Sequence, residues 1–228
     1  MAEAKGQVGV LQPPGFGAAS LADRAYYALR EMIVSLELRP GAVIDERALM
    51  ERLGIGRTPT REALRRLAQE RLVEVYPRRG MFVTSVEIRD LASLTEVRSL
   101  LESHVARLAA ERATDEDRSA LKSLLDELES RADLDTSELM ALDERIHRQV
   151  YSSAHNPFLE STLEEYYVLA LRIWYLALDR TRELEQAVLG HRELLEAIRD
   201  GDADRAEQTM RRHVVDFGEA MRRVLTGG

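Results

Sequence analysis

The apolar positions of this chain recur mostly at helical spacing, and the elements they predict fall into two groups along the sequence. The first group mixes short helices with two segments typical of strands, and Pro-Arg-Arg-Gly at 77–80 supplies the turn between those strands. The helices are expected at about 20–36, 45–53 and 58–70, and the strands at 72–76 and 81–86. Residues 1–19 are rich in Gly, Pro, Ala and Gln and show no period, which predicts a flexible tail.

Every segment from residue 87 onward is predicted to be helical. The expected helices span about 88–112, 114–131, 136–154, 156–178, 181–199 and 201–225, with short connections between them. About six or seven helices joined in this way form an antiparallel bundle. The chain is therefore predicted to be mainly α, with a mixed domain at 20–86 and a helical domain at 87–228.

Charge is distributed unevenly between these two predicted domains. Residues 21–85 hold 12 Arg against 9 Asp and Glu, whereas residues 86–228 hold 19 Lys and Arg against 30 Asp and Glu. The net charge of −8 argues against a uniformly basic nucleic-acid binder. A small basic domain joined to a larger acidic one nevertheless suits a DNA-binding protein whose second domain has another task.

Composition excludes some classes of site and location. The chain has no cysteine, which rules out disulfides and thiolate metal sites. We find no secretory signal and no apolar stretch long enough to cross a bilayer, so we expect a cytoplasmic location and no membrane partner.

The helix predicted at 58–70 has one apolar and one polar face. Its apolar stripe runs from Ala63 to Ala68, and Thr58 is expected to cap its first turn with Pro59 at the first helical position. The opposite face carries arginines and threonines, which suit phosphates and guanine edges. A solvated arginine-rich face would look the same in isolation. The preceding helix and the following hairpin, however, give the order of a winged helix-turn-helix, in which this helix reads DNA.

Three short motifs lie in this domain: Asp-Glu-Arg at 45–47, Leu-Gly-Ile-Gly-Arg-Thr-Pro-Thr-Arg-Glu-Ala-Leu at 53–64, and Arg-Gly-Met-Phe-Val at 79–83. With these motifs, the chain over about 20–86 resembles the winged-helix domain of the GntR family of bacterial transcription regulators. Gly56 and Thr60 stand where many relatives have Ser and Val, so the operator sequence stays open.

The resemblance implies that Arg47, Arg57, Arg61 and Gly80 match DNA-contacting positions of the family, and that Thr58 and Thr60 touch backbone or bases. Arg78 and Arg79 at the hairpin tip are expected to reach phosphates or the minor groove. The expected DNA-facing residues are therefore Arg47, Arg57, Thr58, Thr60, Arg61, Arg65, Arg78, Arg79 and Gly80.

Three histidines lie on helix faces that should point into the bundle: His147, His191 and His213. Asp143 lies four residues before His147, so the two side chains project side by side, as two ligands of one metal require. Two further imidazoles would complete a three-His, one-carboxylate set that suits zinc, or else nickel, manganese or iron, and leaves a position for water or an anion. A lone inward histidine is more often a hydrogen-bonded core residue, and periodicity does not show that the helices converge.

The helical remainder of the chain resembles the FCD domain, the ligand-binding domain of the FadR branch of the GntR family. Many FCD domains bind a metal through an Asp-x-x-x-His pair and two later histidines on the last two helices. That pattern implies Asp143, His147, His191 and His213 as the ligands here.

Arg98 is also predicted to face the bundle, because it shares a stripe with Leu101, Val105 and Leu108. A buried guanidinium needs an anionic partner, either an acidic side chain of the protein or the carboxylate of a ligand that also touches the metal. FCD domains resemble this arrangement, with an Arg on their first helix. Arg172 is a second candidate for effector binding, whereas Trp174 is expected to belong to the core.

These features predict a ligand-responsive, sequence-specific DNA-binding transcription regulator, most simply a repressor and not an enzyme. A homodimer would place one reading helix on each half of a palindromic operator, and a small organic carboxylate would act as effector. The alternatives are a metal-dependent enzyme that carries a DNA-binding domain, and a regulator whose metal is structural or is itself the signal.

Overall fold

The computed structural model describes residues 20–85, 88–130, 135–176 and 186–226, and the tail predicted at 1–19 lies outside them. The chain divides into two compact units, Met1–Val86 and Glu87–Gly228. None of the described helices has the length and apolar character needed to cross a membrane.

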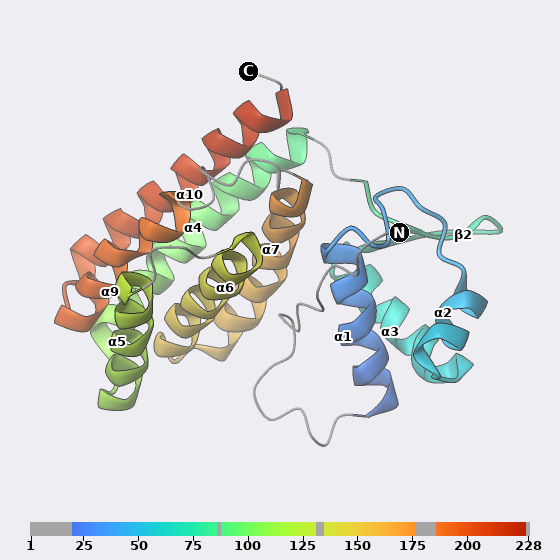
Figure 1. Ribbon diagram of the computed structural model, residues 1–228, viewed down its shortest axis with the longest axis horizontal. Helices are drawn as coiled ribbons and strands as arrows, with labels where there is room; N and C mark the ends of the chain where they lie inside the picture. Colours follow the sequence, from blue (N-terminus) through green and yellow to red (C-terminus); the bar gives the residue numbers. More distant parts are fainter. Residues whose placement is uncertain (1–19, 86–87, 131–134, 177–185, 227–228) are drawn as a thin grey trace. The chain divides into compact units, whose positions relative to one another are not determined.

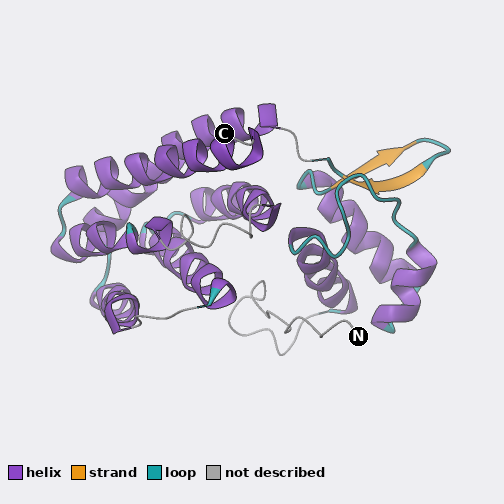
Figure 2. Cartoon of the chain, turned by 45° about the horizontal axis from the view of Figure 1, so that its top comes forward, coloured by secondary structure: helices purple, strands orange, loops and turns teal. Residues whose placement is uncertain are grey.

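The first unit is a helix-turn-helix followed by a two-stranded hairpin (Figure 1, Figure 2). Its elements are α1 (Leu21–Val34), α2 (Glu46–Leu53), α3 (Arg57–Gln69), β1 (Val73–Tyr76) and β2 (Gly80–Val83). The strands are antiparallel, with Val73 opposite Val83 and Tyr76 opposite Gly80. The predicted order of helices and strands is confirmed, and the hairpin after α3 is the wing.

Local sequence signals fix the helix ends of this unit. Ser20 and Asp23 form a capping box at the start of α1, in which each side chain accepts the other residue's backbone N–H. Asp45 caps α2 by accepting two backbone N–H groups, and Gly54 ends that helix with a φ of 63°. Only residues 54–56 separate α2 from α3, so the two helices form a tight pair.

The core of the first unit lies between α1 and α3. Leu29 and Ile33 of α1 and Leu64 and Leu67 of α3 are fully buried. Burial of an aliphatic side chain is worth about 1.5–3 kcal/mol, so this apolar contact, more than helix propensity, holds α3 in place.

The start of α3 differs from the prediction. Gly56 is the N-cap without any side-chain hydrogen bond, so Thr58 and Pro59 are the second and third helical residues. Proline is tolerated there because the first four N–H groups of a helix have no intrahelical partner. The strand predicted at 81–86 is also shorter, since β2 ends at Val83.

The second unit is an all-helical bundle (Figure 1). Its named helices are α4 (Ile88–Arg112), α5 (Asp115–Ser130), α6 (Thr136–Ser153), α7 (Pro157–Leu176), α9 (His191–Asp200) and α10 (Ala203–Thr226). The predicted fold class, a winged helix-turn-helix followed by a helical bundle, is confirmed.

The prediction of a single helix at 181–199 is wrong for the part of it that the structure describes. Residues 186–189 are helical, Gly190 forms a turn, and α9 starts afresh at His191; residues 181–185 lie outside the described residues. A Cβ at Gly190 would lie 3.2 Å from the carbonyl oxygen of Ala187, a contact that glycine avoids. The break makes His191 the first residue of α9.

Helices α4 and α10 lie side by side over much of their length (Figure 1). A Cβ at Gly218 of α10 would lie 2.5 Å from the hydroxyl oxygen of Thr95 on α4 and 2.7 Å from its methyl carbon. That hydroxyl donates a hydrogen bond to the carbonyl oxygen of Leu91 at 2.8 Å, which holds the Thr95 side chain in place. Glycine at 218 therefore permits the close approach of the two helices.

We expect Gly218→Ala to lower the free energy of unfolding by about 1–3 kcal/mol, because the added methyl group overpacks the α4–α10 contact. Urea denaturation measures this change. Adding Thr95→Ala removes the obstructing atoms and should restore most of the loss. A Gly218→Ala variant as stable as the parent would contradict the close approach.

Candidate functional site

The outward face of α3 exposes Arg57, Thr58, Arg61 and Arg65. No side-chain oxygen caps the start of this helix, so protein side chains do not occupy its first N–H groups. Such groups, with the positive end of the helix dipole, bind phosphate well. This end of α3 thus combines guanidinium and backbone donors.

Two exposed ion pairs position arginines beside that face. Arg61 Nε lies 2.6 Å from Glu46 Oε2 of α2, and Arg47 Nε lies 3.0 Å from Glu51 Oε1. Exposed pairs of this kind contribute little to stability because water screens them, so a phosphate oxygen can compete for either guanidinium.

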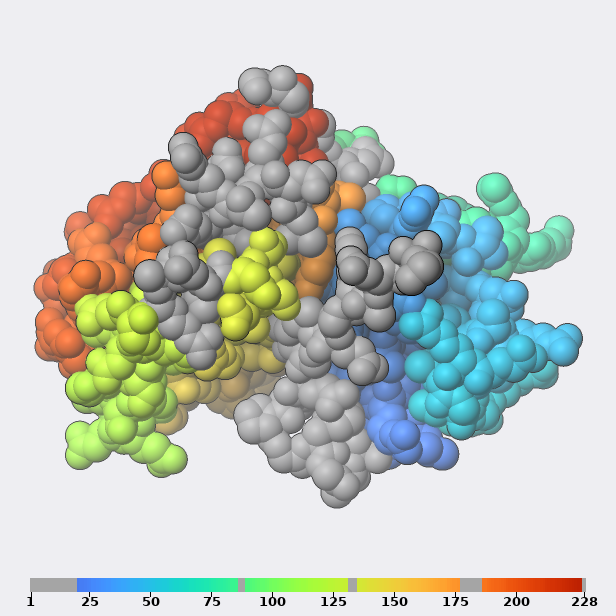
Figure 3. All heavy atoms as spheres, viewed as in Figure 1, coloured from blue at the N-terminus to red at the C-terminus, as the bar shows by residue number. Residues whose placement is uncertain are grey.

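The wing supplies the other exposed cations of the predicted set. Arg78 and Arg79 lie in the turn between β1 and β2, with Gly80 at the start of β2 at a φ of 98°. Figure 3 shows the wing as a projecting tip of the first unit. Every residue of the predicted DNA-facing set except one lies on the surface.

Thr60 is that exception, and we remove it from the set. Its side chain is fully buried, and its hydroxyl donates to the carbonyl oxygen of Gly56 at 3.0 Å. The spacing already carried this signal, because Thr60 lies three and four residues before Ala63 and Leu64 on the apolar stripe.

In the second unit, α6, α9 and α10 bring Asp143, His147, His191 and His213 together. One ligand atom from each residue lies within 4.8 Å of the others. His147 Nε2 and His191 Nε2 are 3.2 Å apart, and Asp143 Oδ1 lies 3.8 Å and 3.7 Å from them. The four predicted ligands therefore form one cluster, buried except for partly exposed His213.

The outer ring nitrogens show how two of these imidazoles are oriented. His191 Nδ1 lies 3.1 Å from the carbonyl oxygen of Val188, which can only accept, so this nitrogen carries the proton. His147 Nδ1 lies 3.1 Å from Glu102 Oε2 and 3.2 Å from the Tyr151 hydroxyl. A proton on Nδ1 satisfies this pair of oxygens best. Both Nε2 atoms then present lone pairs to the cluster.

These facing lone pairs fit a bound cation. Asp143 Oδ1 is buried and accepts no hydrogen bond from the described residues. Burial lowers the pKa of His191 to about 4 and that of His213 well below its ordinary value, so neither imidazole supplies the missing charge at neutral pH. A tetrahedral ion with ligands at about 2.0–2.1 Å separates its ligand atoms by about 3.3 Å, close to the spacing of the His147, His191 and Asp143 atoms here. The residues present therefore fit a metal ion.

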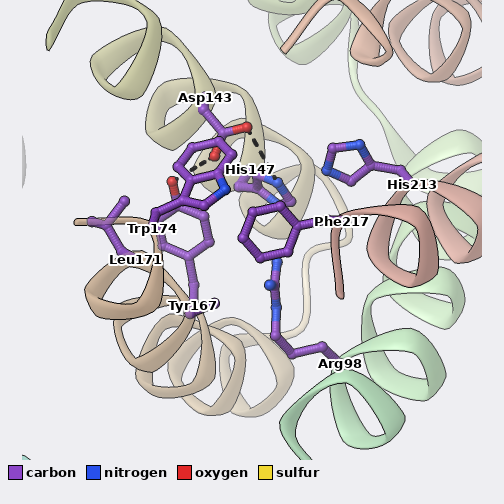
Figure 4. Close-up of a pocket in the computed structure, with 9 residues that line it drawn as sticks. Arg98, Asp143, His147, Tyr167, Leu171, Trp174, His213 and Phe217 are labelled. Carbon is purple, nitrogen blue, oxygen red and sulfur yellow. Dashed lines mark hydrogen bonds and ion pairs between the residues drawn. The ribbon is translucent and has the colours of Figure 1, made fainter. Parts of the chain in front are cut away.

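The second oxygen of Asp143 is held by a tyrosine. Tyr167 donates its hydroxyl to Asp143 Oδ2 at 2.8 Å (Figure 4). Burial, and next the Asp143 charge, raise the pKa of Tyr167 well above its ordinary value, so the hydroxyl stays a donor. This contact turns Oδ1 toward the histidines.

A pocket adjoins the cluster (Figure 4). Its empty volume is about 230 Å³, including the part open to solvent, and its lining residues are Arg98, Asp143, His147, Tyr167, Ala170, Leu171, Trp174, His213 and Phe217. The guanidinium carbon of Arg98 lies 5.9 Å from the ring centre of Tyr167 and 5.7 Å from that of Phe217. One cavity thus joins three of the clustered residues to a buried guanidinium.

Arg98 also has a partner within the protein. Its Nε lies 2.5 Å from Glu102 Oε1, and both side chains are buried. Burial alone would raise the pKa of Glu102, but Arg98 and then His147 lower it to about 2. Of the two alternatives for Arg98, the glutamate salt bridge is therefore present. Within the described residues the guanidinium hydrogen-bonds only through Nε, so its two terminal nitrogens make no hydrogen bond with Glu102.

The remaining sequence expectations have mixed outcomes. Arg172 is buried, and burial lowers its pKa to about 10, but it does not line the pocket and we withdraw it as an effector contact. The other two histidines, His104 and His155, are exposed and lie outside the cluster. Trp174 is buried, as expected of a core residue, and it also lines the pocket.

Three residues of the site were missed. Glu102 follows Arg98 by one helical turn, a spacing that signals an ion pair. Tyr167 and Trp174 are seven residues apart and flank Leu171 on one helix face. That periodicity identifies a buried face, but it does not distinguish a pocket lining from a core.

A winged helix-turn-helix joined to a helical bundle with an internal pocket defines a class of two-domain DNA-binding regulators. Residues 21–83 match the family described as bacterial regulatory proteins, gntR family, and residues 93–216 match the FCD domain. The chain belongs to the GntR family and is a DNA-binding transcription regulator with an FCD domain.

Curated relatives and solved structures agree with this assignment. The chain is 34% identical over 192 residues, 83% of its length and 80% of the relative's, to an uncharacterized HTH-type transcriptional regulator of Streptomyces ambofaciens. It is 31% identical over 212 residues, 82% and 90% of the two lengths, to the galactonate operon transcriptional repressor of Escherichia coli. The structure of McbR/YncC from E. coli superposes with a TM-score of 0.77 at 23% identity, covering 92% and 99% of the chains, and shares the fold.

His191→Ala should lower metal content from about one ion per chain to well below that, because it removes one buried ligand. Elemental analysis of protein purified without chelators provides the measurement. His155→Ala is the matched control, since His155 is exposed and should leave the metal in place. If the unchanged protein held no metal after soaking in zinc and dialysis, the histidines would be core residues.

Proposed function

We propose that this regulator is a repressor that releases its operator when a small carboxylate binds beside a divalent transition metal in the helical unit. One observation carries the proposal: a single pocket is lined by Asp143, His147 and His213 of the candidate metal cluster and by the guanidinium of Arg98. A carboxylate can bridge such a pair, with one oxygen on the metal and the other on the fork of the arginine. The galactonate operon repressor, whose name refers to a sugar acid, is consistent with this ligand class.

Asp143, His147, His191 and His213 would hold the metal. Nitrogen and carboxylate ligands suit zinc best, with nickel, manganese or iron as alternatives. The bound metal would supply a positive charge and an open position for an anion.

The pocket also constrains the organic part of the effector. Trp174 Nε1 is buried and has no hydrogen-bond partner among the described residues, and its side chain lines the pocket (Figure 4). A buried donor of this kind favours a ligand with an acceptor opposite it. Together with Arg98, it favours a small acid with a second oxygen, such as a hydroxy acid, a sugar acid or a dicarboxylate.

For DNA recognition we propose a homodimer acting in the cytoplasm. Two copies would place one α3 on each half of a palindromic operator, with the wing arginines on adjacent phosphates or in the minor groove. The effector would lower DNA affinity only by as much as its own affinity differs between the two arrangements of the dimer.

Arg57→Ala should weaken operator binding about 10-fold or more and leave the melting temperature almost unchanged, because Arg57 is exposed and outside the apolar stripe of α3. Mobility shift at two salt concentrations together with thermal unfolding would test this. Thr60→Val is the control. Because Thr60 is buried, this variant should keep its DNA affinity. Equal losses of DNA affinity in both variants would argue against this orientation of α3.

Arg98→Lys tests the carboxylate clamp. Lysine keeps the charge opposite Glu102 but lacks the fork, so the metal should stay while effector affinity falls about 10-fold or more. Small acids are first screened by thermal shift on metal-loaded protein, and the best is then titrated against the variant. Unchanged affinity would remove Arg98 from the site. If chelation alone released DNA and no acid had any effect, the metal would itself be the signal.

A further inference from the structure

Glu102 lies between the candidate metal ligands and the arginine of the pocket. It is fully buried in α4, one turn after Arg98. Its Oε1 accepts the Arg98 Nε–H at 2.5 Å, and its Oε2 lies 3.1 Å from Nδ1 of His147. One carboxylate thus touches both functional groups with its two oxygens.

Neither neighbour alone explains this placement. A buried Arg–Glu pair is complete with one contact, yet the second oxygen lies 3.1 Å from the imidazole Nδ1, and the Tyr151 hydroxyl is a further polar neighbour of this carboxylate. The His147 nitrogen that it approaches is the outer one, since Nε2 faces His191 at 3.2 Å. A carboxylate at the outer nitrogen of an imidazole fixes the tautomer and makes the inner nitrogen more basic.

We propose that Glu102 is a positioning residue shared by the two halves of the site, which orients His147 for the metal and Arg98 for the anion and thereby links the two binding events. An anion bound to Arg98 neutralises part of the guanidinium charge that Glu102 otherwise balances. The negative charge of Glu102 then acts more strongly on the N–H of His147. Anion binding then strengthens metal binding, and by linkage the metal strengthens anion binding equally. The inference rests on the proposed function, because it takes the cluster to be a metal site.

Zinc alone tests the metal half of this inference. Competition against a chromophoric chelator gives the zinc affinity of the full-length protein, Glu102→Gln and a control, Glu111→Gln. Glu111 is also on α4 and pairs at 3.3 Å with Arg107, the residue four positions earlier, but that pair is partly exposed. We expect Glu102→Gln to bind zinc about 10–100-fold more weakly, as loss of an outer-shell partner does, and Glu111→Gln to match the unchanged protein.

A second variant covers the case in which Glu102→Gln leaves Arg98 unpaired and fails to fold. Arg98→Gln with Glu102→Gln makes the pair neutral and should show the same loss of zinc affinity. Cobalt replaces zinc for a spectroscopic readout, and its visible absorption bands should shift in both Glu102 variants but not in Glu111→Gln. If both Glu102 variants bind zinc like the unchanged protein, the shared role of Glu102 is overturned while the proposed function stands.

A metal-free measurement separates failure of this inference from failure of the proposed function. Nitrogen NMR of the metal-free protein reports which ring nitrogen of His147 carries the proton. We expect Nδ1–H in the unchanged protein and in Glu111→Gln, and a mixture of tautomers in Glu102→Gln. If the unchanged protein binds no zinc, the proposed function fails; an Nδ1–H tautomer that depends on Glu102 still supports the positioning role, and one independent of Glu102 overturns it.

Discussion

The helical unit is organised around hydrogen-bond acceptors that face one another inside the bundle. His147 Nε2, His191 Nε2 and Asp143 Oδ1 lie within 3.2–3.8 Å of each other, and the outer nitrogen of each imidazole is turned toward an oxygen. Facing acceptors in a buried site are unfavourable unless a cation lies among them. Tyr167 donates its hydroxyl to Asp143 Oδ2 and leaves Oδ1 facing the histidines. The helix break at Gly190 places His191 at the start of α9, and the buried Glu102 of α4 lies against His147.

The two units differ in how far the sequence predicted them. In the first unit, turn residues and caps are local signals, so the order of elements followed from short motifs such as residues 53–64. The start of α3 was placed wrongly because threonine and proline are both common near helix starts. Thr60 was assigned to DNA on its chemistry, although its position on the apolar stripe indicated burial.

In the second unit, periodicity identified the inward faces but not which faces meet. The histidines of α6, α9 and α10 are far apart in sequence, and only the packing of the bundle brings them together. The helix break at Gly190 was not predicted because the apolar period continues on both sides of it. The places of Glu102 and Trp174 in the site were not predicted for a related reason. A buried side chain has the same period whether it completes a core contact or borders a pocket.

The close contact between Gly218 and Thr95 has a mechanical consequence. A helix of the length of α4, Ile88–Arg112, is a rod of about 37 Å. Thr95 is about 10 Å from the start of this rod, and Arg98 and Glu102 follow it by about one and two helical turns, so the contact fixes the spacing of α4 and α10 next to the two charged residues of the site. With glycine at position 218, the distance between the two helices at this point is set by the side chain of Thr95.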